Sequence, residues 1–534
     1  MDGARSALNR TGTPTAGEPP GGRNTEPHRR DPAATLAIIL ATYFMIVFDN
    51  SIIFTGIRDI AEDLDLSAYA MSWVQNAYTA VFGGLLLLGA RTGDILGRRT
   101  TLIAGLTVFA LASLLVGAAQ NGAWIVAARA LQGVGAAFAA PSSLALVTAA
   151  VPAGKPRVRA VTAYGMMAGL GTSIGFVVGG ALTHWVSWRA GFAINAPIGV
   201  ALIAAALKFL PRTRAVPGRF DMTGAITSTA GMALLAYGIV QCGVSGWTSP
   251  LAFGPVAAAV VVLTVFVVNE GRAEHPIMPL RLFASGQRFI AFVVRLLFAG
   301  SMIPFFFFAS QFLQDTYGWN PLQTGLALVP ATVLQFATSM WTTRLTARFD
   351  NPPLILVGLA LVTAGTACAT QLTATSTYVV GVLVPMVFIG VGQGLTFGPL
   401  TAVGISGAPS EDAGAASGLV NTAHQLGSTL GIAALTAVSA QAIDTAERVA
   451  AAYAAGAVIT AGAMAVSGLL LLPGARNAGG RSQYVDKGTV DLPHLDRALH
   501  RGPVDGRGED AARLCSPHQE RAPVPRHGGR RPAQ

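Results

Sequence analysis

The chain has 534 residues, of which 52% are hydrophobic and 12% are charged, and its mean hydropathy is +0.52. A soluble protein carries about 25% charged residues, so this chain has too little polar surface to cover a water-soluble fold, and lipid is the alternative solvent. The two ends of the chain, residues 1–34 and 474–534, carry half of the formal charge of +10; the other basic residues lie in short segments between apolar runs, which argues against a nucleic-acid-binding face. The three cysteines, Cys242, Cys368 and Cys515, have neither metal nor redox spacing.

Both ends of the chain are polar and rich in Gly, Pro and Arg. Residues 1–34 have almost no apolar periodicity, and no short apolar run with a small-residue cleavage site lies near Met1, so we expect no cleavable signal peptide. Residues 474–534 have the same polar character. We therefore expect two disordered tails.

Between the tails, apolar runs of about 20 residues recur, which is the length that crosses the hydrocarbon core of a bilayer as a helix. The runs are continuous rather than alternating, which excludes a transmembrane barrel. The sequence therefore predicts an all-α polytopic membrane protein. Its fourteen predicted spans are 35–57, 71–90, 101–119, 123–150, 160–183, 192–210, 222–242, 251–269, 288–313, 322–346, 353–371, 377–401, 413–439 and 451–473.

Lys and Arg residues fall mainly on one side of these predicted spans. One set of alternate loops contains fifteen of them, and the opposite set contains only Arg58, Arg189 and Arg448. Both tails fall on the basic side. Because basic loops remain in the cytoplasm, this asymmetry predicts an even number of spans with both termini in the cytoplasm.

The loop after the second predicted span contains a cluster of glycines and charges. It includes Gly89, Asp94, Gly97, Arg98 and Arg99, in the spacing Gly-(x)4-Asp-(x)2-Gly-Arg-Arg. A tight turn with one carboxylate near several guanidiniums can join neighbouring helix ends in one conformation and release them in another. The alternative is a loop that only sets the topology. The spacing resembles the signature loop of the major facilitator superfamily.

Other motifs resemble the same superfamily and follow in the same order. Asp49 in the first span resembles the acidic motif of its fourteen-helix drug:proton antiporter branch. The residues Arg129, Gln132, Gly133 and Gly135 resemble its buried-arginine motif, and Gly171, Gly175, Gly179 and Gly180 resemble its antiporter motif. Segments 187–199, 220–224, 275–283 and 416–422 are similar to markers of that branch. The similarity covers roughly residues 35–473.

This resemblance implies a major facilitator fold. It places one six-helix bundle at 35–210, two inserted helices and a linker at 211–287, and a second six-helix bundle at 288–473. The sequence departs from the family pattern in three places. Phe176 stands where the antiporter motif has proline, His424 stands where these exporters often have arginine, and the second copy of the signature loop, residues 343–350, is degraded.

Asp49 and Arg129 are charged residues deep inside apolar runs. A carboxylate such as Asp49 costs about 3 kcal/mol at the centre of a membrane helix, and a low dielectric favours its uncharged form. Asp49 can therefore load and release a proton, the alternative being a structural carboxylate hydrogen-bonded to a neighbouring helix. Arg129 lies too deep for an orientation signal, and we expect it to pair with Asp49 or with backbone carbonyls. The resemblance implies proton coupling by both.

Gly171, Gly175 and Gly179 recur every four residues and therefore share one helix face. Small residues allow close helix packing in membranes. With Gly180, they are expected to form a helix-packing gate, which the resemblance places between the two halves of the molecule. A static packing seam is the alternative.

The substrate cavity is less easily assigned. Its candidate residues are Gln75, Asn76, Gln311, Asn421, His424 and Gln425. The run Phe305–Phe308 is expected to pack rather than to bind a ligand, and Arg295 is expected to extend toward the membrane interface. The tenth predicted span has no acidic residue, and exporters of lipophilic cations often need a second membrane carboxylate. The resemblance therefore favours a neutral or anionic substrate.

The resemblance implies a proton-coupled antiporter of the plasma (inner) membrane that exports small lipophilic compounds, such as antibiotics, by alternating access. The expected partners are the small-molecule substrate, protons and the bilayer, with no nucleic acid and no obligate protein partner. We expect no cofactor or metal and no direct use of ATP, because no Gly-(x)4-Gly-Lys-Ser/Thr loop occurs.

Two other functions are considered. A proton-coupled importer of a small metabolite would share the fold, but the glycine-rich fifth span argues against it. A polytopic membrane enzyme or sensor would need a clustered catalytic constellation, which the sequence lacks.

Overall fold

The structure is a computed structural model that describes residues 32–471, except 153–154, 212–219, 247, 275 and 410–411. Within these residues the chain is helical and contains no strand. The expected tails lie outside the described residues, apart from residues 32–34. These three residues belong to the first helix, which begins at Pro32. Proline is well tolerated in the first turn of a helix.

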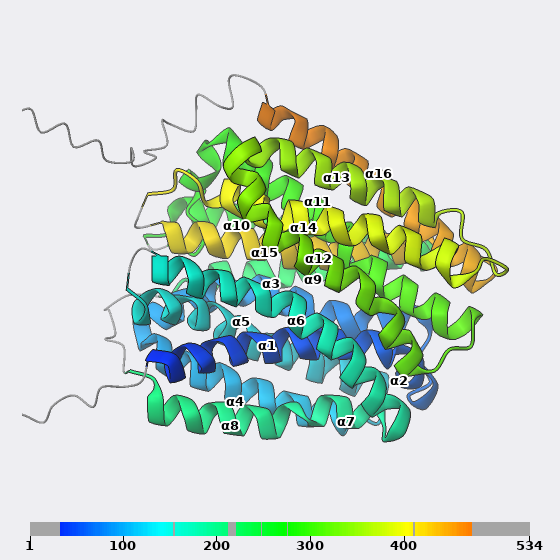
Figure 1. Cartoon of the computed structure of the whole chain (residues 1–534), viewed down its shortest axis with the longest axis horizontal. Coiled ribbons are helices and arrows are strands. Elements are labelled where there is room, and N and C mark those ends of the chain that lie inside the picture. The colour runs from blue at the N-terminus through cyan, green and yellow to red at the C-terminus, as the bar shows by residue number, and fades with distance from the viewer. Residues whose placement is uncertain are drawn as a thin grey trace, which may run out of the picture. The chain divides into compact units, whose positions relative to one another are not determined.

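The first group of helices packs mainly among its own members (Figure 1). It comprises α1 (Pro32–Thr55), α2 (Ile57–Asp63), α3 (Ala68–Leu96), α4 (Arg98–Gly117), α5 (Gly122–Ala150), α6 (Lys155–Trp185), α7 (Trp188–Ala193) and α8 (Asn195–Phe209). Helix α5 packs against both α3 and α4, and α1 packs against α6. The predicted sixth span is broken between α7 and α8, where Pro197 has no N–H to continue the helical ladder.

The second group forms the other half of the molecule. It comprises α11 (Gly286–Gln311), the π-helical turn η2 (Phe312–Thr316), α12 (Pro321–Phe349), α13 (Asn351–Ala369), η3 (Val379–Leu383), α14 (Val384–Ile405), α15 (Ala413–Val438), α16 (Thr445–Gly468) and η4 (Leu469–Leu471). A short 3-10 turn, η1 (Leu280–Ala284), leads into α11. The halves meet where α6 packs on α12 and where α3 packs on α15.

The two inserted helices, α9 (Met222–Ser245) and α10 (Pro250–Arg272), lie beside this junction. Helix α9 contacts α3 of the first half and α15 of the second half, whereas α10 packs on α9. Close approach to α3 is possible because Gly84 has no side chain: a β-carbon there would lie 2.5 Å from Thr229 Oγ1. The inserted pair therefore meets both halves mainly through α9.

Twelve helices among the described residues are long and apolar enough to cross a membrane, which makes this a multi-pass membrane protein. Each of the fourteen predicted spans coincides with a helical region, but α12 and α15 are not among the twelve. Both are long enough, with 29 and 26 residues, and both carry polar side chains at the junction between the halves. The count of fourteen membrane spans therefore stays a prediction.

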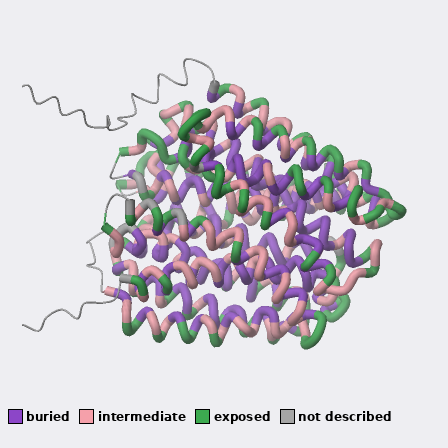
Figure 2. The backbone as a smooth tube through the Cα atoms, in the orientation of Figure 1, coloured by how far each residue is buried: buried purple, intermediate pink, exposed green. Residues whose placement is uncertain are grey.

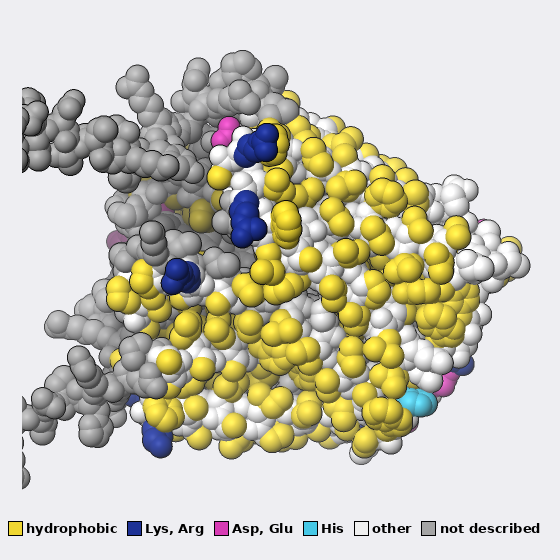
Figure 3. Space-filling view, viewed as in Figure 1, with side chains coloured by type: hydrophobic (Ala, Val, Ile, Leu, Met, Phe, Trp, Pro, Cys, Tyr) yellow, Lys and Arg dark blue, Asp and Glu magenta, His cyan; other side chains and the backbone are white. Residues whose placement is uncertain are grey.

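The surface is arranged as lipid requires. Figure 2 shows buried residues gathered where helices face one another and exposed residues at the outer faces and loops. In Figure 3 apolar side chains cover most of the visible face, and most of the visible basic side chains lie at one end. We call this the basic end; it holds the α3–α4 turn and the start of α6. The opposite end holds α2 and the start of α12.

Two carboxylates face each other where α9 begins and α10 ends. Asp221 caps α9, with Oδ1 accepting from Gly224 N at 2.8 Å. Glu270 is 3% exposed, and its Oε2 accepts from Met278 N at 2.8 Å. Its Oε1 has no hydrogen-bond partner among the described residues. A β-carbon on Gly224 would lie 2.5 Å from both Asp221 Oδ2 and Glu270 Oε1, which places these oxygens within about 4–6 Å, where charges strongly influence each other.

We predict that Glu270→Gln stabilises the protein. The amide retains an acceptor for Met278 N and supplies a donor for Asp221, which removes the cost of an unsatisfied buried atom, about 1–3 kcal/mol. The measurement is the unfolding temperature of purified protein at pH 9 and pH 6. The substitution is expected to raise the unfolding temperature more at pH 9 than at pH 6, because at pH 6 a protonated Glu270 of the wild type can itself donate to Asp221. An unfolding temperature at or below that of the wild type at pH 9 would contradict this arrangement.

Candidate functional site

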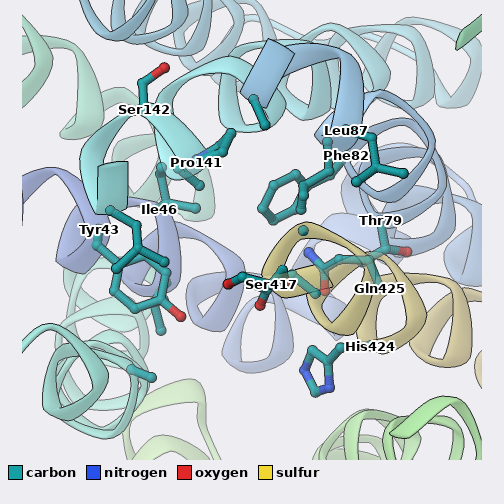
Figure 4. A pocket seen from close by; sticks show the side chains of 18 of the residues that line it. Tyr43, Ile46, Thr79, Phe82, Leu87, Pro141, Ser142, Ser417, His424 and Gln425 are labelled. Carbon is teal, nitrogen blue, oxygen red and sulfur yellow. The ribbon is translucent and has the colours of Figure 1, made fainter. Parts of the chain in front are cut away.

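A cavity of about 770 Å³ lies between the two halves and extends to the basic end. Its inner wall includes Asn50, Tyr78, Phe306, His424 and Gln425. Figure 4 shows side chains from α1, α3 and α5 on one side of this cavity and from α15 on the other. The residues at its mouth are Arg91, Asp94, Arg98, Glu274, Arg281 and Asp412. The cavity therefore connects the middle of the molecule with its basic end.

The opposite end is held closed by contacts between the halves. Arg58 Nη1 donates to Gln314 O at 2.9 Å, and Gln314 Nε2 donates to Thr55 O at 3.2 Å. The Ser310 hydroxyl also donates to Phe54 O. These bonds join the end of α1 and the start of α2 to α11 and η2. A solute in the cavity thus faces a closed end on this side.

Beside the cavity, Asp49 and Arg129 form a buried ion pair. Both side chains are 0% exposed, and Arg129 Nη1 lies 3.0 Å from Asp49 Oδ2. Arg129 Nε also donates to Val74 O at 3.1 Å. The structure thus shows both kinds of partner that the sequence analysis expected for Arg129, the carboxylate of Asp49 and a backbone carbonyl.

Two amides complete the surroundings of the Asp49 carboxylate. Gln132 Nε2 and Asn195 Nδ2 donate to Asp49 Oδ1 at 2.7 and 2.6 Å. Gln132 also accepts from Arg129 Nη1 at 2.6 Å and donates to Ser113 Oγ at 2.8 Å. Neither amide was expected from the sequence to have a role. Gln132 could have been found, because it lies one helical turn after Arg129, whereas Asn195 reaches Asp49 only through the break between α7 and α8.

A chain of hydrogen bonds joins this ion pair to the cavity wall. Arg129 Nη2 donates to Gln75 Oε1 at 3.3 Å, and Gln75 Nε2 donates to Asn50 Oδ1 at 2.9 Å. Asn50 lines the cavity, as does Tyr78, whose ring lies 4.3 Å from the Arg129 guanidinium carbon. The ion pair is therefore buried in protein rather than facing lipid, one layer of side chains from the cavity.

The six predicted cavity residues are divided among different places. Asn421, His424 and Gln425 line the central cavity, whereas Gln75 belongs to the chain of hydrogen bonds behind its wall. Gln311 instead lines a separate cavity of about 320 Å³ at the opposite end. Asn76 is fully buried, lines neither cavity, and its amide has no hydrogen-bond partner among the described residues. Polarity within a span therefore did not show which face of the helix meets the cavity.

The aromatic run of α11 packs as expected. Phe305, Phe306, Phe307 and Phe308 are all at most 3% exposed, and only Phe306 lines the central cavity. No group of three or more His, Cys, Asp or Glu side chains within the described ranges is arranged to hold a metal ion.

The signature loop joins four helices of the first half: α3, α4, α5 and α8. Gly97 has φ of +93° and forms the turn between α3 and α4, a conformation that a side chain would strain. Asp94 and Arg98 form an ion pair of 3.2 Å, and Arg98 Nη1 donates to Ala145 O of α5 at 2.8 Å. Arg99 Nη2 donates to Leu207 O of α8 at 2.5 Å. Gly89 lies directly against Ala137 of α5. That this loop acts as a switch stays a prediction.

A second ion pair at the cavity mouth was not foreseen. Arg281 Nε and Nη2 donate to Asp412 Oδ2 and Oδ1 at 2.6 and 2.8 Å, a bidentate contact. The Arg281 guanidinium holds the pKa of the Asp412 carboxyl below its usual value. This contact joins the linker before α11 to the segment before α15. Nothing in the local sequence pairs two residues so far apart in the chain.

The glycine face of α6 does not lie where the sequence analysis placed it. A β-carbon on Gly175 would lie 2.7 Å from Phe48 O, and one on Gly179 would lie 2.9 Å from Ile52 Cα. Together with Gly171, which faces Phe44 and Val47, these glycines pack α6 against α1 within the same half. Of the four predicted gate glycines, only Gly180 meets the other half.

A different face of α6 contacts the second half. The Ser173 and Thr332 hydroxyls are 2.7 Å apart, and Gly180 lies directly against Pro321 O of α12. Between them, Phe176 O lies against Gly325, and the Phe176 ring packs on Phe306 at 5.4 Å between centroids. The residue that replaces the family's proline therefore forms part of the junction between the halves.

We predict that Gly180→Leu opens the opposite end. The added side chain must separate α6 from α12 next to Thr55, which is fully buried there. The measurement is the alkylation rate of a Thr55→Cys variant by a membrane-impermeant maleimide, with the native cysteines replaced by serine. We expect a rise of about tenfold, as for a large population shift. Gly165→Leu is the matched control, because a β-carbon at Gly165 meets no atom within 4 Å. Equal alkylation rates in both variants would rule out this junction as the seal.

Two helical halves around a cavity, with a buried ion pair beside it, define a membrane transporter. The sequence assigns the class: the chain belongs to the Major Facilitator Superfamily, whose profile matches residues 39–432. It is 36% identical over 416 residues to the cephamycin export protein CmcT of Amycolatopsis lactamdurans, covering 76% of this chain and 85% of that protein. It is 34% identical over 412 residues to the puromycin resistance protein pur8 of Streptomyces alboniger, covering 76% and 82%.

Among solved structures, a nucleoside transporter, NupG, matches with a TM-score of 0.59 at 10% sequence identity. The match covers 82% of this chain and 100% of that chain. At this identity the likeness concerns the fold alone, and it is the fold that the sequence analysis expected.

Proposed function

We propose that this protein is a proton-driven exporter of small lipophilic compounds that works by alternating access. The observation that carries the proposal is the buried Asp49–Arg129 pair, which is linked to the cavity wall through Gln75 and Asn50. Ionisable residues inside membrane spans that pair with one another beside a cavity mark substrate pathways and proton relays. The relatives named above, an antibiotic export protein and an antibiotic resistance protein, support export of an antibiotic or similar toxic compound.

Protonation of Asp49 is the step that would change the conformation. Neutralising one partner of a buried ion pair leaves the other charge uncompensated, which costs about 3–5 kcal/mol. A free-energy change of about 5.5 kcal/mol moves a two-state equilibrium from about 1:99 to about 99:1. One proton on Asp49 therefore supplies most of the free energy needed to rearrange α1, α3, α5 and α8 around it.

The orientation of the chain follows from its loops. We infer that the basic end, at which the cavity opens, faces the cytoplasm of the plasma membrane, with both termini on that side. The structure then represents the conformation that accepts substrate from inside the cell, with the opposite end closed. The proton gradient is the energy source, with no cofactor, no enzymatic activity and no obligate protein partner.

We predict that Asp49→Asn abolishes export. The amide cannot exchange a proton, so the gradient no longer drives the conformational cycle. The measurement is the tolerance of a pump-deficient bacterial host to a panel of lipophilic antibiotics, with membrane abundance checked by immunoblot. Asp65→Asn is the matched control, because Asp65 is exposed at the opposite end and its positive φ of 49° is well suited to asparagine.

The wild type and Asp65→Asn are expected to raise tolerance to at least one compound. In everted vesicles, a protonophore should abolish transport of the same compound. Full tolerance in an Asp49→Asn strain with normal abundance would exclude Asp49 from coupling. Uptake of the same compound into cells, rather than its loss, would favour the importer.

A further inference from the structure

Arg295 does not extend to the membrane interface as the sequence analysis expected. It lies in α11 and is 1% exposed. Its guanidinium carbon lies 3.7 Å from the centre of the Phe397 ring of α14, and Nη1 donates to Phe397 O at 3.4 Å. Its Nε has no hydrogen-bond partner among the described residues. Stacking on Phe397 holds the side chain inside the bundle, because a guanidinium packs favourably on an aromatic face.

The positive charge of Arg295 is not balanced by an acid. Within the described part of the chain it forms no ion pair. The acids that line the cavity are Asp94, Glu274 and Asp412. Asp94 is paired with Arg98 and Asp412 with Arg281, all four at the cavity mouth. In the described part of the chain, no acidic residue lies on the inner wall next to Arg295.

Two other buried arginines, Arg129 and Arg288, have more hydrogen-bond partners than Arg295. Arg129 has the Asp49 carboxylate and two further side-chain oxygens. Arg288, two turns before Arg295 in α11, donates to Leu282 O at 3.0 Å and to Ser406 O at 3.3 Å. An uncompensated buried charge costs several kcal/mol. The uncompensated charge of Arg295 therefore stabilises an anion that enters the cavity.

The cavity wall next to Arg295 is suited to such an anion. Phe397 and His424 both line the cavity, and their rings pack edge to face at 5.7 Å. His424 Nδ1 is buried without a hydrogen-bond partner among the described residues. Tyr43 lines the facing wall, and the charge of Arg295 acts on both Tyr43 and His424. Figure 4 shows Tyr43 and His424 approaching the cavity from α1 and α15.

We propose that the cavity selects amphipathic organic anions, and that Arg295 with His424 recognises their carboxylate. The proposal rests on the proposed function and names its substrate class. His424 Nδ1, which has no partner among the described residues, can donate to a carboxylate oxygen, and the Arg295 guanidinium, whose Nε is also without a partner there, supplies the positive charge that favours an anion. The aromatic and aliphatic wall, which includes Phe82, Phe306 and Ile303, receives the apolar part of the molecule. Arg295 is a specificity-determining residue that acts from behind the Phe397 ring through its charge, which is weakly screened in this environment.

The test compares three probes that share one ring system and differ in charge: 1-naphthaleneacetate, 1-naphthaleneacetamide and 1-naphthylmethylamine. Their affinities for the full-length protein in lipid nanodiscs are measured by calorimetry at neutral pH. The wild type is expected to bind the carboxylate about tenfold more tightly than the amide, and the amine most weakly. A wild type that binds the amide or the amine as tightly as the carboxylate, or that binds none of the three, overturns the proposal.

Variants assign the selectivity to Arg295. Arg295→Gln is expected to bind the carboxylate and the amide equally, and Arg295→Lys to retain most of the preference, since it keeps the charge. Arg288→Gln is the control, because it removes a buried arginine of the same helix away from the cavity and should leave the preference unchanged. A preference that persists in Arg295→Gln, or that is lost in Arg288→Gln as well, contradicts the assignment.

This experiment is independent of transport. Binding is measured without a proton gradient, so failure of proton-driven export leaves a carboxylate preference intact and overturns only the proposed function. Conversely, robust export by a protein without a carboxylate preference overturns only the substrate class.

Discussion

A carboxylate and a guanidinium that are both removed from water must satisfy each other and every remaining donor and acceptor. In this protein that constraint falls on Asp49 and Arg129, which are both fully buried. The Asp49 carboxylate accepts hydrogen bonds from Arg129 and Gln132 of α5 and from Asn195 of α8. The position of α1 relative to α5 and α8 is therefore fixed by one carboxylate. Any event that changes its charge must move these helices.

The two halves of the molecule hold their buried charges differently. In the first half Asp49 and Arg129 neutralise each other one side chain behind the cavity wall. In the second half Arg295 stands without an acid beside the same cavity. In the functions proposed above, this asymmetry separates two tasks: the first half responds to protons, and the second half selects the substrate. Both act on a single cavity that opens at the basic end and is closed at the other.

Much of this arrangement was predictable from the sequence. Every predicted span coincides with a helical region, because apolar runs of this length have few alternatives. The pairing of Asp49 with Arg129 was predictable since isolated charges are too costly within a membrane. Gln132 could have been found as well, because it lies one helical turn after Arg129, whereas Asn195 could not, because only tertiary packing brings α8 to Asp49. The face of α6 that meets α12 was missed for a related reason: α6 packs on two neighbours, and the glycine spacing indicates only the closer contact with α1.

The central claim is that Asp49 changes its protonation inside the folded protein. Infrared difference spectroscopy tests it most directly, on purified protein in lipid taken between alkaline and acidic pH. We predict a carboxylic C=O stretching band that grows on acidification in the wild type and is absent in Asp49→Asn. An identical difference spectrum in both proteins would show that Asp49 keeps one charge state throughout, and the account of coupling given above would be wrong.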